Sequence, residues 1–229
     1  MRPIYVSKTL AAADDNGICA SQTPGAAGNM TINGVLASGG VATLDTQRIV
    51  LFTFAADETG TNFTVYGADD NGVSLQETVA GTATTAVTTQ SFKTVTRIAI
   101  SAAAAGAIIV GTNGVGATPW QIISNAMTPT GLGIGITVSG TVDFTWQYTF
   151  EDPSGTYPNP AAATSGYINP AQPNAITKFP TAWNLTALAA KSANTDSSRS
   201  SPIYAWRLQI NSGTGTAQAT VVQAGIAGN

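Results

Sequence analysis

Apolar and polar residues alternate along one segment of the chain, VDFTWQYTF at residues 142–150. Its even-numbered positions are apolar and its odd-numbered positions are mostly polar. Successive side chains of a β-strand point to opposite faces of the sheet, so this pattern predicts a strand with one face on a core. We therefore expect Trp146 to be buried.

Seven further segments are short, rich in Val, Ile, Thr and aromatic residues, and bounded by turn residues, which is typical of strands. They are residues 48–54, 62–67, 94–100, 108–111, 134–138, 205–210 and 217–223. Gly-containing clusters interrupt the pattern too often for long helices, and residues 183–191 are the one stretch where we expect a helix. The regular spacing predicts an all-β fold of the β-sandwich or jelly-roll type with little helix.

The two halves of the chain follow a similar order of elements. Residues 49–72 and 133–155 each carry a strand, a Gly-Thr turn, a second strand and an acidic turn, and Gly60 aligns with Gly140. Each half closes on an Arg-bearing strand, with Arg97 and Arg207 at matching positions. We infer two related β-sandwich domains, and the competing architecture is a single large jelly roll.

Changes in composition suggest the domain boundaries. The first 40 residues, with a strand expected at residues 30–37, form either an arm that reaches a neighbouring subunit or an edge strand of the first sandwich. Residues 117–131 form a linker that is anchored through Trp120, Ile122 and Ile123. The expected divisions are an arm or edge strand at 1–40, a first sandwich at 41–116, a linker at 117–131, and a second sandwich at 132–229 with an insertion at about 157–199.

The composition removes most classes of chemistry. Asp, Glu, Lys and Arg make up 9% of the chain, against about 25% in an average soluble domain. There is no histidine, which excludes Ser-His-Asp and Cys-His arrangements and histidine metal ligands. The net charge of −3 provides no basic field for nucleic acid or an anionic membrane. We therefore expect no catalytic residue, no cofactor, no metal, and neither nucleic acid nor a membrane as partner.

The opening of the chain bears on its solubility, and its cysteine content bears on the source of its stability. The opening MRPIYVSKTL lacks the apolar run of a secretory signal, so we expect a protein that is soluble when made. The single cysteine, Cys19, has no partner for an intramolecular disulfide. Stability is therefore expected to come from packing or from partner subunits.

Four acidic pairs are the remaining candidates for chemistry: Asp14-Asp15, Asp57-Glu58, Asp69-Asp70 and Glu151-Asp152. Two carboxylates that flank a glycosidic bond can hydrolyse it. All four pairs stand beside Asn, Gly, Ser or Thr in expected turns, where carboxylates commonly accept bonds from backbone N–H groups. We favour this structural role. The repeated ADDNG at residues 13–17 and 68–72 keeps calcium as an alternative, although the loop lacks the ligand spacing of a calcium hand.

Aromatic residues suggest a second kind of site. Exposed rings on a β-sandwich can stack on sugars, and the candidates in the expected insertion are Tyr157, Tyr167 and Trp183. Glycan binding is therefore kept as an alternative function.

Low charge combined with many small residues is typical of a protein that assembles. Interface cores are depleted in Lys, Glu and Asp, and small side chains let backbones approach closely. A monomer with so little charge would leave its sheet edges open to association. Burial of those edges in a homo-oligomer, such as a cyclic trimer, would protect them.

Several blocks of the sequence resemble structural proteins of tailed bacteriophages. They are the opening MRPIYV, the block TFAADETGTNFTVYGADDNGVSLQETVAGTATTAVTTQSFKTVTRIAIS, the VGTNGVG after it, and the closing YAWRLQINSGTGTAQATVVQAG. In that family, such turn-and-strand blocks recur around β-sandwich domains. The resemblance covers most of the chain from Arg48 onward except the insertion.

The resemblance implies a non-enzymatic virion protein. Within that class we favour a capsid decoration, or cement, protein that binds the outside of the major capsid protein lattice as an oligomer. Its location would be the capsid surface after synthesis in the bacterial host cytoplasm. The alternatives are a head-to-tail connector or tail component, and a glycan-binding module for host attachment. The sequence identifies no binding residue for the capsid.

Overall fold

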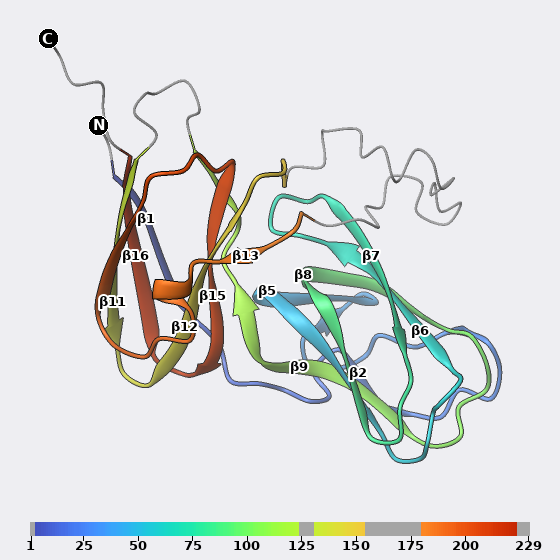
Figure 1. Cartoon of the computed structure of the whole chain (residues 1–229). Helices are drawn as coiled ribbons and strands as arrows, with labels where there is room; N and C mark the ends of the chain where they lie inside the picture. Colours follow the sequence, from blue (N-terminus) through green and yellow to red (C-terminus); the bar gives the residue numbers. More distant parts are fainter. Residues whose placement is uncertain (1–2, 124–130, 154–179, 224–229) are drawn as a thin grey trace, which may run out of the picture. The chain divides into compact units, whose positions relative to one another are not determined.

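The computed structural model describes residues 3–123, 131–153 and 180–223, and this part of the chain is nearly all β (Figure 1). The chain divides into two compact units. We call residues 12–113 the N-terminal unit, and residues 3–11, 114–153 and 180–223 the C-terminal unit. Strand β9 (Ile108–Ala117) passes from the first to the second.

The N-terminal unit is built on two long strands, β5 (Val41–Phe54) and β8 (Thr85–Ile100), which pair antiparallel with two shifts of register. Such shifts mark bulges, which bend a strand, so both strands can curve around one core. The rings of Phe52, Phe54 and Phe63 lie 5.1–6.3 Å apart in that core. The remaining strands are β2 (Cys19–Gln22), β3 (Gly28–Asn29), β4 (Ala37–Ser38), β6 (Asn62–Ala68) and β7 (Ser74–Ala80).

The C-terminal unit is a sandwich of two antiparallel layers (Figure 1). One layer has the order β1-β16-β11-β14, formed by Ile4–Thr9, Thr216–Gln223, Leu132–Ser139 and Thr195–Arg199. In the other layer, β12 (Val142–Thr149) pairs with β15 (Ala205–Gly213). The short strand β13 (Trp183–Asn184) flanks β12, while β10 (Gln121–Ile122) and the end of β9 pair with β15.

The core of this sandwich comes from the alternation seen in the sequence. Phe144 and Trp146 of β12 and Trp206 of β15 are fully buried, and the two indole rings stack at 5.9 Å. Opposite them, β11 and β16 contribute Ile134, Ile136 and neighbouring small apolar residues. The expected burial of Trp146 is confirmed, as are all eight expected strands and the all-β class.

Both aligned Gly-Thr turns place glycine in the left-handed region. Gly60 has φ of 92° and Gly140 has φ of 76°. A side chain at either position would strain the backbone. The fold therefore requires glycine at both of these turns, which the sequence alignment had identified.

Two expected elements are wrong. Residues 30–37 do not form a strand, because only Ala37 enters β4, although Met30 and Ile32 are buried in the core. Residues 183–191 do not form a helix: they begin as strand β13 and continue into one 3-10 turn, Thr186–Leu188. Pairing of Trp183 with Tyr148 across β12 and β13 overrides the local helical pattern.

The structural units also differ from the expected divisions. Ile4–Thr9 pairs with β16 of the C-terminal unit, so this strand is not part of the first sandwich. In the expected linker, Ile123 is buried but Ile122 is 53% exposed. Within the expected insertion, Thr195–Arg199 is an edge strand of the sandwich itself. The part of the insertion at residues 157–179 lies outside the described residues.

Candidate interaction surface

Exposed aromatic side chains continue the buried aromatic core of the C-terminal unit. Tyr148 lies two residues after Trp146 on the same face of β12, and their rings are 6.0 Å apart. Phe150 follows on the same parity, with its ring edge-on to Tyr148 at 5.6 Å. Trp183 stands opposite Tyr148 in the register of β13. Phe150 is 54% exposed and Trp183 is 51% exposed.

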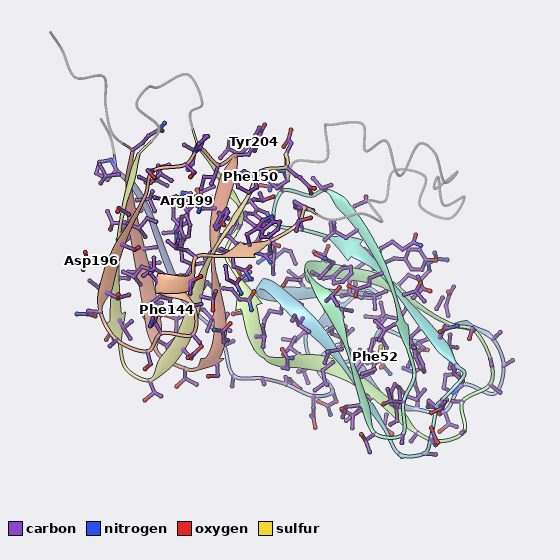
Figure 2. All side chains as sticks on the ribbon, viewed as in Figure 1. Phe52, Phe144, Phe150, Asp196, Arg199 and Tyr204 are labelled. Atoms are coloured by element: carbon purple, nitrogen blue, oxygen red, sulfur yellow. The ribbon has the colours of Figure 1, made fainter. Side chains whose placement is uncertain are left out.

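One arginine completes this group. The guanidinium carbon of Arg199 lies 3.8 Å from the centre of the Tyr148 ring and 5.8 Å from that of Phe150. Arg199 is the last residue of β14 and pairs with the buried Leu132, so its side chain points to the inside of the sandwich. Figure 2 labels Arg199 and Phe150 at the same end of the unit. We call Tyr148, Phe150, Trp183 and Arg199 the aromatic surface.

The chemistry of the aromatic surface favours binding to another molecule. Large rings at the end of a core cost free energy while they face water. Trp, Tyr and Arg are also the residues that dominate the binding energy of protein interfaces. The sequence indicated Trp183 as a surface aromatic but missed the other three. A signal for Tyr148 and Phe150 was present in the period-two pattern, whereas the approach of Arg199 is a product of sheet packing.

The other expected glycan-binding residues, Tyr157 and Tyr167, lie outside the described residues. The Arg207 guanidinium lies 4.5 Å from the centre of the Trp120 ring. It therefore covers one face of this ring, which a sugar could otherwise stack on. Burial lowers the pKa of Arg207 to about 10. Its Nε donates to Gln147 at 2.8 Å, and the arginine remains charged at neutral pH.

The first aspartate of three acidic pairs, Asp14, Asp57 and Asp69, accepts a bond from a backbone N–H group two residues later, as expected of a turn. Asp57 Oδ1 accepts bonds from the backbone N–H and hydroxyl of Thr59 at 2.9 and 2.6 Å. Asp69 Oδ1 accepts from the N–H groups of Asn71 and Val73, each at 2.8 Å. Hydrogen bonds to the carboxylate lower the pKa of Asp57, while burial, the larger influence, raises that of Asp69.

Other carboxylates reach farther along the chain. Glu58 is 2% exposed, and its Oε1 accepts from the N–H groups of Ala105 and Gly106 at 2.8 and 3.1 Å. Glu151 Oε2 accepts from the N–H of Thr181 at 2.9 Å. Within the described ranges, no group of three or more His, Cys, Asp or Glu residues is placed to hold a metal ion.

Comparisons with known proteins give no match: no family model, curated protein or solved structure resembles this chain. Among the described residues, no helix has the length and apolar character needed to cross a membrane. The class that the structure establishes is therefore an all-β protein of two units, with the aromatic surface on the C-terminal unit.

Proposed function

We propose that this chain is a non-enzymatic structural protein of a tailed-phage virion that decorates the major capsid protein lattice. The observation that carries the proposal is the aromatic surface, where Phe150 and Trp183 are about half exposed and Arg199 lies near the Phe150 ring. Rings and one arginine on a weakly charged β-sandwich have the composition of an interface centre. The resemblance of the sequence blocks to phage structural proteins supports the choice of partner.

In this role the protein would contribute binding area. Shallow contacts repeated at many symmetric sites add through avidity, so each site can be weak. Such a task needs sandwiches that keep their shape and surfaces with little charge. It needs no histidine, metal or cofactor.

Copy number in fractionated particles tests the assignment. Purified virions are separated into heads and tails, and this chain is quantified in each fraction by mass spectrometry. Hundreds of copies on heads are expected. A dozen or fewer copies at the neck or tail would instead support a connector or tail component, and absence from particles would overturn the virion assignment.

Recombinant protein added to undecorated capsids tests the surface. We expect saturable binding that falls at least 10-fold for the double variant Phe150→Ala/Trp183→Ala, because hot-spot residues typically contribute 2 kcal/mol or more each. Val35→Ala is the matched control, since Val35 is 78% exposed but belongs to the N-terminal unit. Equal binding of all three proteins would contradict the role of the aromatic surface.

The exposure of Trp183 also supports the second candidate, a glycan-binding module for host attachment. Trp120, Trp146, Trp183 and Trp206 are all in the C-terminal unit, so tryptophan fluorescence reports on this unit alone. Glycan binding predicts that host surface polysaccharide quenches this fluorescence in wild type but not in Trp183→Phe. Capsid decoration predicts no quenching.

A further inference from the structure

Arg199 is the one charged member of the aromatic surface, and it has no acidic partner among the described residues. Its guanidinium contacts rings instead, with its carbon 3.8 Å from the centre of Tyr148 and 5.8 Å from that of Phe150. A guanidinium carries five N–H donors and no acceptor. A ring face attracts the charge but does not accept those donors as a carboxylate does. The charge of Arg199 is therefore not balanced within the described part of the chain.

Two acidic residues that the sequence places near the aromatic surface are directed elsewhere. Glu151 follows Phe150, but its Oε2 accepts a hydrogen bond from the backbone N–H of Thr181 at 2.9 Å. Asp196 and Arg199 are both on β14, three positions apart. Side chains alternate along a strand, so these two point to opposite faces of the sheet, and Figure 2 labels them apart. Neither carboxylate neutralises Arg199.

The guanidinium of Arg199 is partly withdrawn from water. The residue is partly buried, and its Nε is fully buried without a hydrogen-bond acceptor. The two Nη atoms are not buried in this way, so they are the nitrogens that a ligand can reach. A carboxylate can accept from both Nη atoms at once. Such a charge-assisted bond is stronger where the surroundings exclude part of the water.

The rings next to Arg199 define what must accompany the carboxylate. Tyr148 holds the guanidinium through the cation–π contact, so little side-chain freedom is lost when a ligand binds. Phe150, whose ring is edge-on to Tyr148, is 54% exposed and offers apolar area. A ligand that satisfies both features carries an apolar group beside its carboxylate.

We propose that Arg199 makes the aromatic surface selective for a protein segment with an acidic side chain next to an apolar one. The carboxylate accepts from the Nη atoms of Arg199, and the apolar group packs on Phe150. A small polar ligand would need several converging polar groups, whereas this surface offers ring faces and one cation, which suits a protein partner. The inference rests on the proposed function for the identity of the partner and adds the chemistry of the segment that it presents.

Two dipeptide probes test the selectivity. N-acetyl-Phe-Asp-amide and N-acetyl-Phe-Asn-amide differ only in the carboxylate. Binding at low salt is followed through the Nε–H resonance of Arg199 and the indole N–H resonance of Trp183. The Asp probe is expected to bind wild type at least 10-fold more tightly than the Asn probe, because bonds to charged groups are the stronger ones. In Arg199→Gln this preference should disappear, and Trp183 then reports on the binding.

Arg97→Gln is the matched control. The guanidinium carbon of Arg97 lies 3.6 Å from the centre of the Tyr66 ring, so this variant also loses a stacked arginine and one positive charge. Arg97 belongs to the N-terminal unit, and Tyr66 is buried, so no exposed ring of this pair accompanies the cation. Arg97→Gln should keep the preference for the Asp probe. A merely structural role of Arg199 would weaken both probes equally and leave their ratio unchanged.

Binding to undecorated capsids tests the same residue with the proposed partner. Arg199→Gln is expected to bind at least 10-fold more weakly than wild type, and Arg97→Gln is expected to bind like wild type. Arg199→Lys should recover part of the loss, since it keeps the charge but not the two parallel donors.

Three results would overturn the inference. They are equal affinity of wild type for the two dipeptides, a preference for the Asp probe that persists in Arg199→Gln, and binding of glucuronate as tightly as the Asp probe, which would indicate an acidic sugar instead of a protein segment. A wild type that prefers the Asp probe over the Asn probe and glucuronate but does not bind capsids would support the selectivity of Arg199 and contradict the proposed function alone.

Discussion

The guanidinium carbon of Arg199 lies 3.8 Å from the centre of the Tyr148 ring, so the two layers of the C-terminal sandwich meet through a cation–π contact at its aromatic end. Arg199 comes from the edge strand β14 of one layer, and Tyr148 comes from β12 of the other. The contact orders a ring next to the exposed Phe150 and Trp183. It therefore links the stability of the sandwich to the shape of the aromatic surface.

Removal of the Arg199 side chain should destabilise the C-terminal unit. We expect Arg199→Ala to lower its unfolding free energy by about 1 kcal/mol, from lost stacking and lost packing of the side-chain stem. Urea titration followed by tryptophan fluorescence measures this unit specifically. Arg199→Lys keeps the charge but not the planar group, and should recover only part of the loss. Full recovery by lysine would show that charge alone matters.

A buried arginine should matter more in the N-terminal unit. Arg48 is 1% exposed, its Nη1 lies 3.1 Å from Asp45 Oδ1, and its Nη2 donates to the carbonyl of Asn113. Arg48→Ala removes the packing of a buried side-chain stem and leaves the Asn113 carbonyl without this donor, so we expect it to cost about 2 kcal/mol. Because Cys19 belongs to the same unit, the denaturant midpoint of thiol labelling reports this change. An unchanged midpoint would contradict the structural role of Arg48.

The contributions of Asp57 and Asp69 to the stability of the fold should change with pH in opposite directions. The folded pKa of Asp57 is lowered by its bonds from Thr59, so Asp57 stabilises the fold above its unfolded pKa and loses that contribution as pH falls. The folded pKa of Asp69 is raised, chiefly by burial, so its contribution is present at low pH and is lost as pH rises through that pKa.

Substitution by asparagine separates the two cases. Relative to wild type, Asp57→Asn should lose more stability at pH 7 than at pH 3, whereas Asp69→Asn should be better tolerated at pH 7 than at pH 3. Chemical denaturation of both variants at the two pH values measures the difference. The same pH trend in both variants would contradict the assigned causes.

The single thiol should be inert in the folded protein. Burial raises the pKa of Cys19 from an ordinary value of 9.0 to about 12. At pH 9, labelling by a thiol reagent should therefore follow unfolding and accelerate with denaturant. The unfolded thiol ionises first, so this group makes stability fall as pH rises from about 9 to about 12. Cys19→Ala should lack that contribution, and rapid labelling of native protein would contradict the burial of the thiol.

Local pattern was sufficient for much of this fold. The alternation around Trp146 predicted a strand and a buried ring, and Gly-Thr pairs predicted turns that need the left-handed conformation of Gly60 and Gly140. Acidic residues next to Asn and Thr predicted bonds such as that from Thr59 to Asp57. These features depend on neighbours within a few residues, so the sequence alone determined them.

Pairing between distant segments was decided only by the tertiary structure. Tyr5 and Thr220 face each other in one sheet, although 215 positions separate them. Alternation shows that a strand has a buried face, but every strand offers the same backbone donors and acceptors, so local sequence does not select the partner. The same reason explains why Trp183 became part of an edge strand beside Tyr148 and why Arg199 reached an aromatic ring.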